Sequence, residues 1–415
     1  MPETQAPPRP RTDGAEPAAA ARPFADALRY AAPALLGYAA VRLTGLAILL
    51  AVAAARGQDG VLRLHGRWDS LWYQRIAQHG YGHTAVLPDG TLHSDLAFFP
   101  LLPALERALH ALVPPLDVAG AGLLVSWAAS VAAAWGIFAV GARLYGRRAG
   151  VLLAVLWGAY PTAFVQSMAY TEALFTALAA WSLYAVLRDR WVSAGLLAVG
   201  AGLTRPVAAA LVAAIAVAGV RRLAARRGSG VRPRRVVAGV LLAPLGWLGY
   251  VCFVAVREGR PFAYFDVQAG WDNRIDGGAA LARFVAGQFA VNAFAGAGLC
   301  AAFAVLGWAL WAALRLRPAL PVAVYGVAVV VVSLVGSGYF GSRPRLMMPS
   351  FLLLLGPAVA LAGLRRRWAP AVVVGAAGVA SGAYGALTLL GGGAAVRRGG
   401  NGAAPPGGSG GPRAA

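Results

Sequence analysis

About eleven long apolar runs divide this sequence, and short clusters of arginine separate many of them. A helix needs roughly 20 apolar residues to cross a bilayer, about twice the length of a membrane β-strand. Hydrophobic residues make up 59% of the chain and charged residues only 13%, against roughly 25% charged in an average soluble domain. The pattern predicts an all-α polytopic membrane protein, and it excludes a soluble enzyme and a small secreted disulfide module. The runs cover residues 31–55, 118–142, 150–166, 169–187, 192–204, 206–220, 236–255, 288–314, 319–338, 346–363 and 369–391.

The ends of the chain differ in composition from its middle. Residues 1–28 are rich in proline, alanine and charge and lack an apolar core, so we expect a disordered cytoplasmic segment and not a signal peptide. Residues 396–415 form a low-complexity tail of Gly, Pro and Ala, which we also expect to be disordered. The segment between them, 29–395, is predicted to be one transmembrane domain.

The arginine clusters predict the orientation of the chain. All 37 basic residues are arginine, and the net charge is +21. Short arginine-rich loops remain on the cytoplasmic side of a membrane, and the strongest cluster is 221–235. Placing the clusters inside makes the loops 56–117, 256–287 and 339–345 extracytoplasmic. The arginines mark topology and follow no amphipathic face, so a nucleic-acid partner is not expected. The predicted location is a bacterial plasma membrane.

The acidic residues gather on the opposite side. Of the 16 acidic residues, eleven lie on or next to the predicted outward loops. Any chemistry is therefore expected on the extracytoplasmic face. The eleven are Asp59, Asp69, Asp89, Asp95, Glu106, Asp117, Glu172, Glu258, Asp266, Asp272 and Asp276.

The segment 191–220 is too short for two full spans, although both of its ends are predicted to be cytoplasmic. Pro206 would end a helix at Arg205. We expect two short, half-depth helices that meet at Arg205 and line a cavity, as broken helices in membranes do. One long tilted helix is the alternative.

Residues 66–82, GRWDSLWYQRIAQHGYG, open the first outward loop. Trp68, Trp72 and Ile76 recur at helical spacing and form one apolar stripe, which is typical of a helix in the membrane interface. Asp69 lies beside the stripe, one turn from Tyr73. A carboxylate at the lipid boundary is costly unless it has a partner or a functional role. A helix cap or an ion pair with Arg67 would explain Asp69 without a functional role.

Two further segments carry acids toward the same face. Residues 94–109 predict a short interfacial or re-entrant helix, with Asp95 just ahead of it. Glu172, beside Tyr170, lies between two apolar runs at the membrane edge, where an acid is by default a functional candidate. Equally, Glu172 could simply start a helix, because acidic residues are favoured in the first turn. Asp95 could equally be a solvated loop charge.

Arg343 and Arg345 oppose the positive-inside bias, because they precede a late span on the outward side. Something should compensate these charges, and a phosphate group matches the guanidinium fork. Snorkelling at a helix end is the alternative.

A metal site is not expected. Five histidines occur, and His79 and His83 are four residues apart, but no helix motif with a carboxylate accompanies them. The two cysteines, Cys252 and Cys300, are far apart within apolar runs and suggest neither a disulfide framework nor a thiolate site.

Four segments, taken in order, resemble the PIG-V-like mannosyltransferases, the family of GPI mannosyltransferase 2 and its bacterial relatives. These segments are RWDSLWYQRIAQHGYG, SDLAFFPLLP, AYTEALF and GLTRP. The resemblance covers about residues 60–210 and fades afterwards. The later segment SRPRLMMPSF is similar to the arginine-bearing segment of many polyprenyl-phosphate-sugar transferases, which is a weaker match.

The resemblance implies a GT-C type membrane glycosyltransferase, a bundle of about 11 transmembrane helices with a helical first extracytoplasmic loop. Such enzymes take a sugar from a polyprenyl-phosphate donor on the extracytoplasmic side and invert the anomeric carbon. The position that matches the family's catalytic acid is Asp69. The acceptor is not implied, because a bacterial chain lacks the GPI precursor.

On this basis we expect Asp69 to act as the general base and several other residues to contact the substrates. The acceptor hydroxyl needs a base, while the phosphate leaves as a stable anion that arginine can stabilise. Apart from the lipid-linked donor, no cofactor is expected, and a divalent metal is not expected. Partners would be membrane lipid, the donor and an unknown glycan, lipid or protein acceptor. The expected substrate contacts are Trp68, Tyr73, Asp95, Tyr170, Glu172, Arg205, Arg343 and Arg345.

Two alternatives to this function remain open. A transporter or lipid flippase without covalent chemistry would predict ionisable residues at the bilayer midplane and repeated halves, and neither is evident. A GT-C transferase for another sugar is the second alternative, because one sequence does not identify the sugar.

Overall fold

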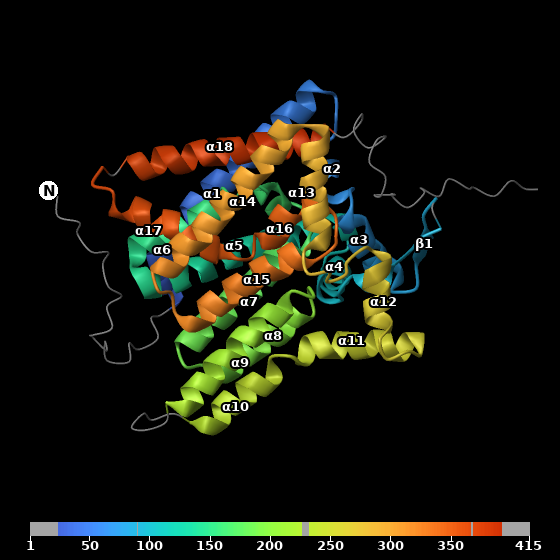
Figure 1. Cartoon of the computed structure of the whole chain (residues 1–415), viewed down its shortest axis with the longest axis horizontal. Helices are drawn as coiled ribbons and strands as arrows, with labels where there is room; N and C mark the ends of the chain where they lie inside the picture. Colours follow the sequence, from blue (N-terminus) through green and yellow to red (C-terminus); the bar gives the residue numbers. More distant parts are fainter. Residues whose placement is uncertain (1–23, 89, 226–231, 367, 392–415) are drawn as a thin grey trace, which may run out of the picture.

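A computed structural model describes residues 24–88, 90–225, 232–366 and 368–391 (Figure 1). The predicted C-terminal tail and most of the predicted N-terminal segment lie outside these residues. The first helix begins at Phe24, ahead of the predicted first span at 31.

Helices dominate the described chain, as predicted. They are α1 (Phe24–Ala55), α2 (Leu62–His65), α3 (Asp69–His79), α4 (Leu101–Leu112), α5 (Val118–Tyr145), α6 (Arg147–Gly158), α7 (Thr171–Leu187), α8 (Trp191–Gly202), α9 (Ala208–Ala224), α10 (Pro233–Leu242), α11 (Leu245–Glu258), α12 (Ala263–Gly270), α13 (Ala279–Val291), α14 (Ala293–Arg315), α15 (Leu320–Val335), α16 (Arg343–Met347), α17 (Leu355–Gly363) and α18 (Ala369–Leu390). Short 3₁₀ turns occur at Asp95–Ala97, Ala163–Ser167, Phe340–Ser342 and Phe351–Leu354. One antiparallel hairpin, β1 (Thr84–Val86) with β2 (Leu92–Ser94), was not predicted.

The helix lengths match a polytopic membrane protein. In the described chain, 5 helical segments are long and apolar enough to span a bilayer: α1, α5, α10 with α11, α14 and α18. The segments Phe340–Met347 and Phe351–Gly363 form a sixth, bent by 74°. Shorter apolar helices are α7, α8, α13 and α15. The total is close to the predicted eleven runs, and the chain is an all-α polytopic membrane protein.

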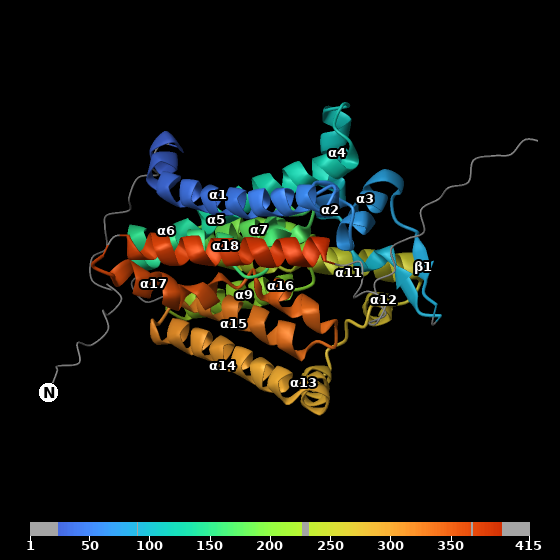
Figure 2. The same cartoon turned by 90° about the horizontal axis from the view of Figure 1, so that it is seen from above.

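The long helices run side by side along the longest axis of the molecule, in layers (Figure 2). α5 lies in the interior, where it packs along α6 and α7, while α1 lies against α6 and α18. The most apolar window of α5 is 56% buried, whereas that of α14 is only 6% buried. α14 therefore presents most of its surface to lipid, and the core lies around α5, α6 and α7.

The short elements gather at one end of this bundle. In Figure 2, α2, α3, β1 and α12 lie together at the end opposite to the start of α6 and the loop before α18. The described arginine clusters next to α6 and α18 lie at that other end. We call the end that holds these clusters the arginine-rich end, and the opposite end, with Asp69 at the start of α3, the acidic end.

α8 and α9 form a hairpin with its tip at Arg205. The break between them, 203–207, lies where the sequence predicts it. The open ends of the hairpin meet, because Arg222 near the end of α9 pairs with Asp189 just before α8, with Nε to Oδ1 at 2.9 Å. α9 has 17 residues and is longer than the predicted half-depth helix.

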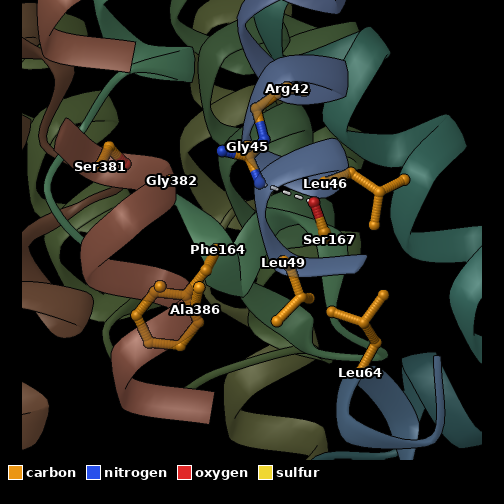
Figure 3. A pocket seen from close by; sticks show the side chains of 11 residues that line it. Arg42, Gly45, Leu46, Leu49, Leu64, Phe164, Ser167, Ser381, Gly382 and Ala386 are labelled. Atoms are coloured by element: carbon orange, nitrogen blue, oxygen red, sulfur yellow. Dashed lines mark hydrogen bonds between the residues drawn. The ribbon is translucent and has the colours of Figure 1, made fainter. Parts of the chain in front are cut away.

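A half-buried arginine, Arg42, lies in the middle of α1 (Figure 3). The Arg42 Nη2 donates to the Ser167 hydroxyl at 2.6 Å, and its Nη1 donates to the Gly158 carbonyl at 3.3 Å. Gly45 and Gly382 lie beside it and allow α1 and α18 to approach closely. Arg42 therefore ties α1 to the segment that leads into α7, with neutral partners in place of a carboxylate.

Gly246 allows α11 to cross α8 in direct backbone contact. A Cβ atom at Gly246 would lie 2.0 Å from the Val199 carbonyl oxygen, so that Gly246→Ala should push the helices apart. We expect the free energy of unfolding to fall by about 1–3 kcal/mol, measured by denaturant titration in mixed micelles. Gly249→Ala, on the same helix with nothing within 4 Å of the new Cβ, is the control and should change little. Equal effects of the two variants would contradict this account of the crossing.

Candidate functional site

Helix α3, in the segment predicted to be the first outward loop, positions Asp69. α3 begins at Asp69, directly after Trp68, whose backbone has the unusual positive φ of 50°. The backbone N–H of Asp69 donates to the Tyr170 hydroxyl at 3.2 Å, which satisfies a group that the start of a helix leaves free. Trp72 and Ile76 are buried as the predicted stripe requires, whereas Trp68 lies just outside the helix and is 40% exposed.

Glu172 lies in the first turn of α7 and is fully buried. The turn before it is fixed by Ser126 of α5, whose hydroxyl donates to the Tyr170 carbonyl and accepts from the Tyr170 N–H at 3.1 and 3.2 Å. A carboxylate buried at this depth needs cationic partners. Glu172 has two of them.

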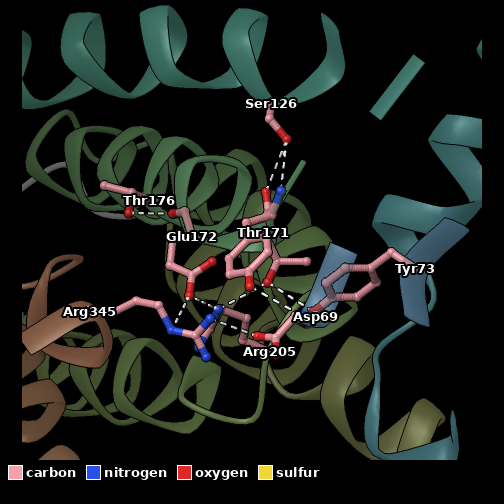
Figure 4. A network of polar contacts seen from close by, with 9 residues as sticks. Asp69, Tyr73, Ser126, Thr171, Glu172, Thr176, Arg205 and Arg345 are labelled. Carbon is pink, nitrogen blue, oxygen red and sulfur yellow. Dashed lines mark hydrogen bonds and ion pairs between the residues drawn. The ribbon is translucent and has the colours of Figure 1, made fainter. Parts of the chain in front are cut away.

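The bend between α16 and α17 brings Arg345 to these acids. Its Nη1 lies 2.8 Å from the Asp69 Oδ2, and its Nε lies 3.3 Å from the Glu172 Oε1. The guanidinium also lies over the Tyr170 ring, with Cζ 5.1 Å from the ring centre. Arg345 therefore joins the start of α3 to the start of α7 (Figure 4).

Arg205, at the tip of the α8–α9 hairpin, completes the cluster. Its Nη1 lies 2.7 Å from the same Glu172 Oε1 and donates to the Thr171 hydroxyl at 3.0 Å. That hydroxyl also shares a 3.2 Å hydrogen bond with the Tyr73 hydroxyl of α3. Two carboxylates and two guanidinium groups from four separate segments thus meet at one place, which we call the Asp69–Arg345 cluster.

The two carboxylates of the cluster differ in access. The Asp69 side chain is 27% exposed, whereas that of Glu172 has no exposed surface. The Tyr73 hydroxyl is no competing base, because burial and the nearby Asp69 carboxylate raise the pKa of Tyr73 and keep its proton in place. Asp69 is therefore the carboxylate of the cluster that is open to solvent.

Arg343 and Asp95 lie apart from the Asp69–Arg345 cluster. The Arg343 guanidinium donates to the carbonyl oxygens of Ser333, Leu334 and Gly336 at 2.7–2.9 Å, so it holds the end of α15. The buried Asp95 carboxylate accepts from the backbone N–H groups of Gly82 and His83, the latter at 2.8 Å. These geometries assign Arg343 and Asp95 to the support of the loops.

Two residues that position the cluster carried no clear signal in the sequence. Thr171 links Arg205 to Tyr73, although a threonine beside an acid reads first as the start of a helix. Ser126 lies in the middle of an apolar run, and only the fold shows that it holds Tyr170. The partner of Asp69 is Arg345, while the Arg67 guanidinium lies over the Trp68 ring instead.

Within the described chain, no group of three or more His, Cys, Asp or Glu side chains is arranged to hold a metal ion. α3 ends at His79, and Gly80 follows with a positive φ of 77°. His79 and His83 therefore do not share one helix face.

Glu172→Gln tests the ionic core of the site. The change leaves Arg205 buried without a carboxylate, and breaking a buried pair costs about 3–5 kcal/mol. We expect a loss of that size in the free energy of unfolding, measured in mixed micelles. Glu258→Gln, at an exposed acid at the end of α11, is the control. Equal stability of the two variants would show that the buried pairs contribute nothing net.

Two solved structures are similar to the chain. The crystal structure of ArnT from Cupriavidus metallidurans bound to undecaprenyl phosphate aligns with a TM-score of 0.49 and 17% identity over 79% of this chain. The apo structure of the same protein gives a TM-score of 0.48 and 15% identity over 83% of this chain and 75% of that one. The chain spans 62% of the first of these structures. No protein-family model and no curated protein matches the chain. The roles of individual residues therefore rest on this chain's own geometry.

Proposed function

We propose that this protein is an inverting glycosyltransferase of the GT-C type. It moves a mannosyl or other hexosyl residue from a polyprenyl-phosphate sugar to an acceptor on the extracytoplasmic side of the membrane. The observation that carries the proposal is the Asp69–Arg345 cluster, in which an accessible carboxylate lies 2.8 Å from a guanidinium at the acidic end of a membrane bundle.

The proposed reaction needs one base and one anion site. The acceptor oxygen attacks the anomeric carbon and its proton passes to Asp69, while the bond from that carbon to the phosphate oxygen breaks. The electron pair leaves with the polyprenyl phosphate, whose charge Arg345 stabilises. No acid is needed for the leaving group, which fits a cluster with a single accessible carboxylate.

The donor phosphate would compete for a guanidinium that two carboxylates now share. When the phosphate binds Arg345, Asp69 loses its cation and is free to accept a proton from the acceptor hydroxyl. Arg205 is the second phosphate contact, and Glu172 fixes the spacing of the two arginines through one shared oxygen. Arg343, which is bound to carbonyl groups, keeps a supporting role.

The remaining predicted contacts concern the sugar and the acceptor. Glu172 is fully buried and its Oε1 is held by Arg205 and Arg345, so its proposed part in substrate binding is to position these two arginines. Trp68 is exposed beside Asp69 and offers an apolar face to a sugar ring. Tyr73 and Tyr170 position Thr171 and Asp69, while Asp95 supports the hairpin loop. Mannose is favoured by the motif resemblance of residues 60–210.

The test is a transfer assay in membranes. Membranes with the wild-type chain, with Asp69→Asn or without the protein receive polyprenyl-phosphate-[¹⁴C]mannose and a cell-envelope extract as acceptor. We expect labelled product only with the wild type. Polyprenyl-phosphate-glucose, in a parallel arm, reports on the choice of sugar. Absence of transfer by the wild type from every lipid-linked donor would overturn the proposal.

The extracytoplasmic position of the site has its own test. In a background without Cys252 and Cys300, a cysteine at Ala279 should react with a membrane-impermeant maleimide in intact cells. A cysteine at Ala225, next to the arginine-rich loop, should react only after permeabilisation. The reverse pattern would place the site on the cytoplasmic side.

A further inference from the structure

A groove lies between α1, α6 and α18, away from the Asp69–Arg345 cluster. Its volume is about 750 Å³, within the range of ligand sites. Most of its lining is apolar, and at Gly375 an added Cβ would meet nothing within 4 Å, so the space is open there. We call it the α1–α18 groove.

The groove has the length of one acyl chain. On α1 it runs from Pro33 to Thr44, which corresponds to roughly 16 Å of helix. Half of a bilayer's hydrocarbon core is about 15 Å thick. On α6 and α18 the lining begins at Arg148 and Pro370, next to the start of each helix, so that the groove reaches the arginine-rich end of the bundle. Figure 2 shows α1 bending away from the bundle before the groove, and Pro33 lies inside this helix.

Cations surround the mouth of the groove. Arg148 lines it and donates one hydrogen bond, from Nη2 to the Leu364 carbonyl at 3.0 Å. Arg365 and Arg366, which directly follow Leu364 in the chain, are exposed. Among the described residues of α1, α6 and α18, Asp26 is the one acid, and it pairs with Arg29 at 3.4 Å. The mouth therefore carries positive charge that no carboxylate of these helices neutralises.

We propose that the α1–α18 groove binds one anionic phospholipid, with an acyl chain between the helices and the phosphate at Arg148. A guanidinium with free N–H groups suits a phosphate, and basic pockets between membrane helices select anionic head groups. The lipid would fill the space between α1 and α18, whose other ends frame the catalytic side of the bundle. This site is independent of the proposed reaction.

The test uses native mass spectrometry of the purified chain in mixed micelles of phosphatidylglycerol and phosphatidylcholine. The wild type should retain one phosphatidylglycerol, about five-fold in preference to phosphatidylcholine. Gly375→Leu should abolish retention, since a side chain there meets nothing within 4 Å and enters the groove without strain. Arg148→Gln should still retain lipid but lose the preference for phosphatidylglycerol, because the guanidinium is removed.

Matched variants on α14 complete the design. Gly307→Leu is equally free of neighbours within 4 Å, and Arg315→Gln removes a cation at the same end of the bundle. Both should retain the lipid as the wild type does. Equal retention of the two lipids by the wild type, or phosphatidylglycerol retention that Gly375→Leu leaves intact, would overturn the proposal.

Discussion

Asp69→Asn should lower the rate of sugar transfer by about 10²–10⁴-fold, the range that a positioned general base supplies. The amide keeps the size of the carboxylate but cannot take the proton of the acceptor hydroxyl. The change also removes the anion that holds Arg345 at 2.8 Å. The KM for the lipid donor should therefore stay equal or fall, because the guanidinium becomes more available to phosphate. Initial rates over a range of donor concentrations separate the two effects.

Asp272→Asn is the matched control for this variant. Asp272 is an exposed acid between α12 and α13, and its positive φ of 56° is a conformation that asparagine tolerates well. Its transfer rate should equal that of the wild type. A drop in Asp69→Asn that appears only as a higher donor KM would contradict the base role and leave Asp69 as a binding residue.

Arg345→Gln should lower transfer by about 10²–10³-fold, the usual cost of removing one donor that stabilises a developing anion. Because Arg345 is proposed to bind the phosphate before and during the reaction, kcat should fall and the donor KM should rise. The measurement is the same steady-state assay, with folding checked by gel filtration in detergent. Arg345→Lys should recover only part of the loss, since an ammonium group cannot bridge Asp69 and Glu172 as a planar fork does.

Arg343→Gln is the informative comparison, because it removes the same charge two positions earlier. Arg343 donates its hydrogen bonds to three carbonyl groups at the end of α15. We expect a loss of about 2 kcal/mol or more in the free energy of unfolding, with an unchanged donor KM in the folded fraction. A raised donor KM in Arg343→Gln together with a normal KM in Arg345→Gln would exchange the two roles.

The sequence predicted those parts of the site that depend on local pattern. The helix over Asp69, the acid at the start of α7 and the chain break at Arg205 all follow from apolar spacing and from proline. The choice between Arg343 and Arg345 is different in kind, because residues two apart on a helix point in different directions. The packing of α16 determines the choice: Arg343 faces the end of α15, and Arg345 faces Asp69.

Contacts over long distances in the chain could not be predicted from local pattern. Arg345 and Asp69 are brought together by the packing of the whole bundle, and the spacing of neither motif indicates the other. The β1–β2 hairpin does have a local signal in the sequence. Gly90 lies between its strands, and its positive φ is one that glycine adopts readily in hairpin turns. Asn292 similarly caps α14 at a residue within the predicted run 288–314, so that α13 precedes it as a separate helix.

The α8–α9 hairpin has a consequence for how the chain enters the membrane. Its two ends meet through Arg222 and Asp189, so whatever depth each helix reaches, the polypeptide returns to the side from which it left. The two helices α8 and α9 therefore contribute an even number of membrane crossings. Every later loop lies on the same side of the membrane as it would without the hairpin. A chain that lost residues 191–224 would keep the orientation of Arg345 while losing Arg205. A deletion of this hairpin would therefore remove one proposed phosphate contact without changing the side of the membrane on which Arg345 lies.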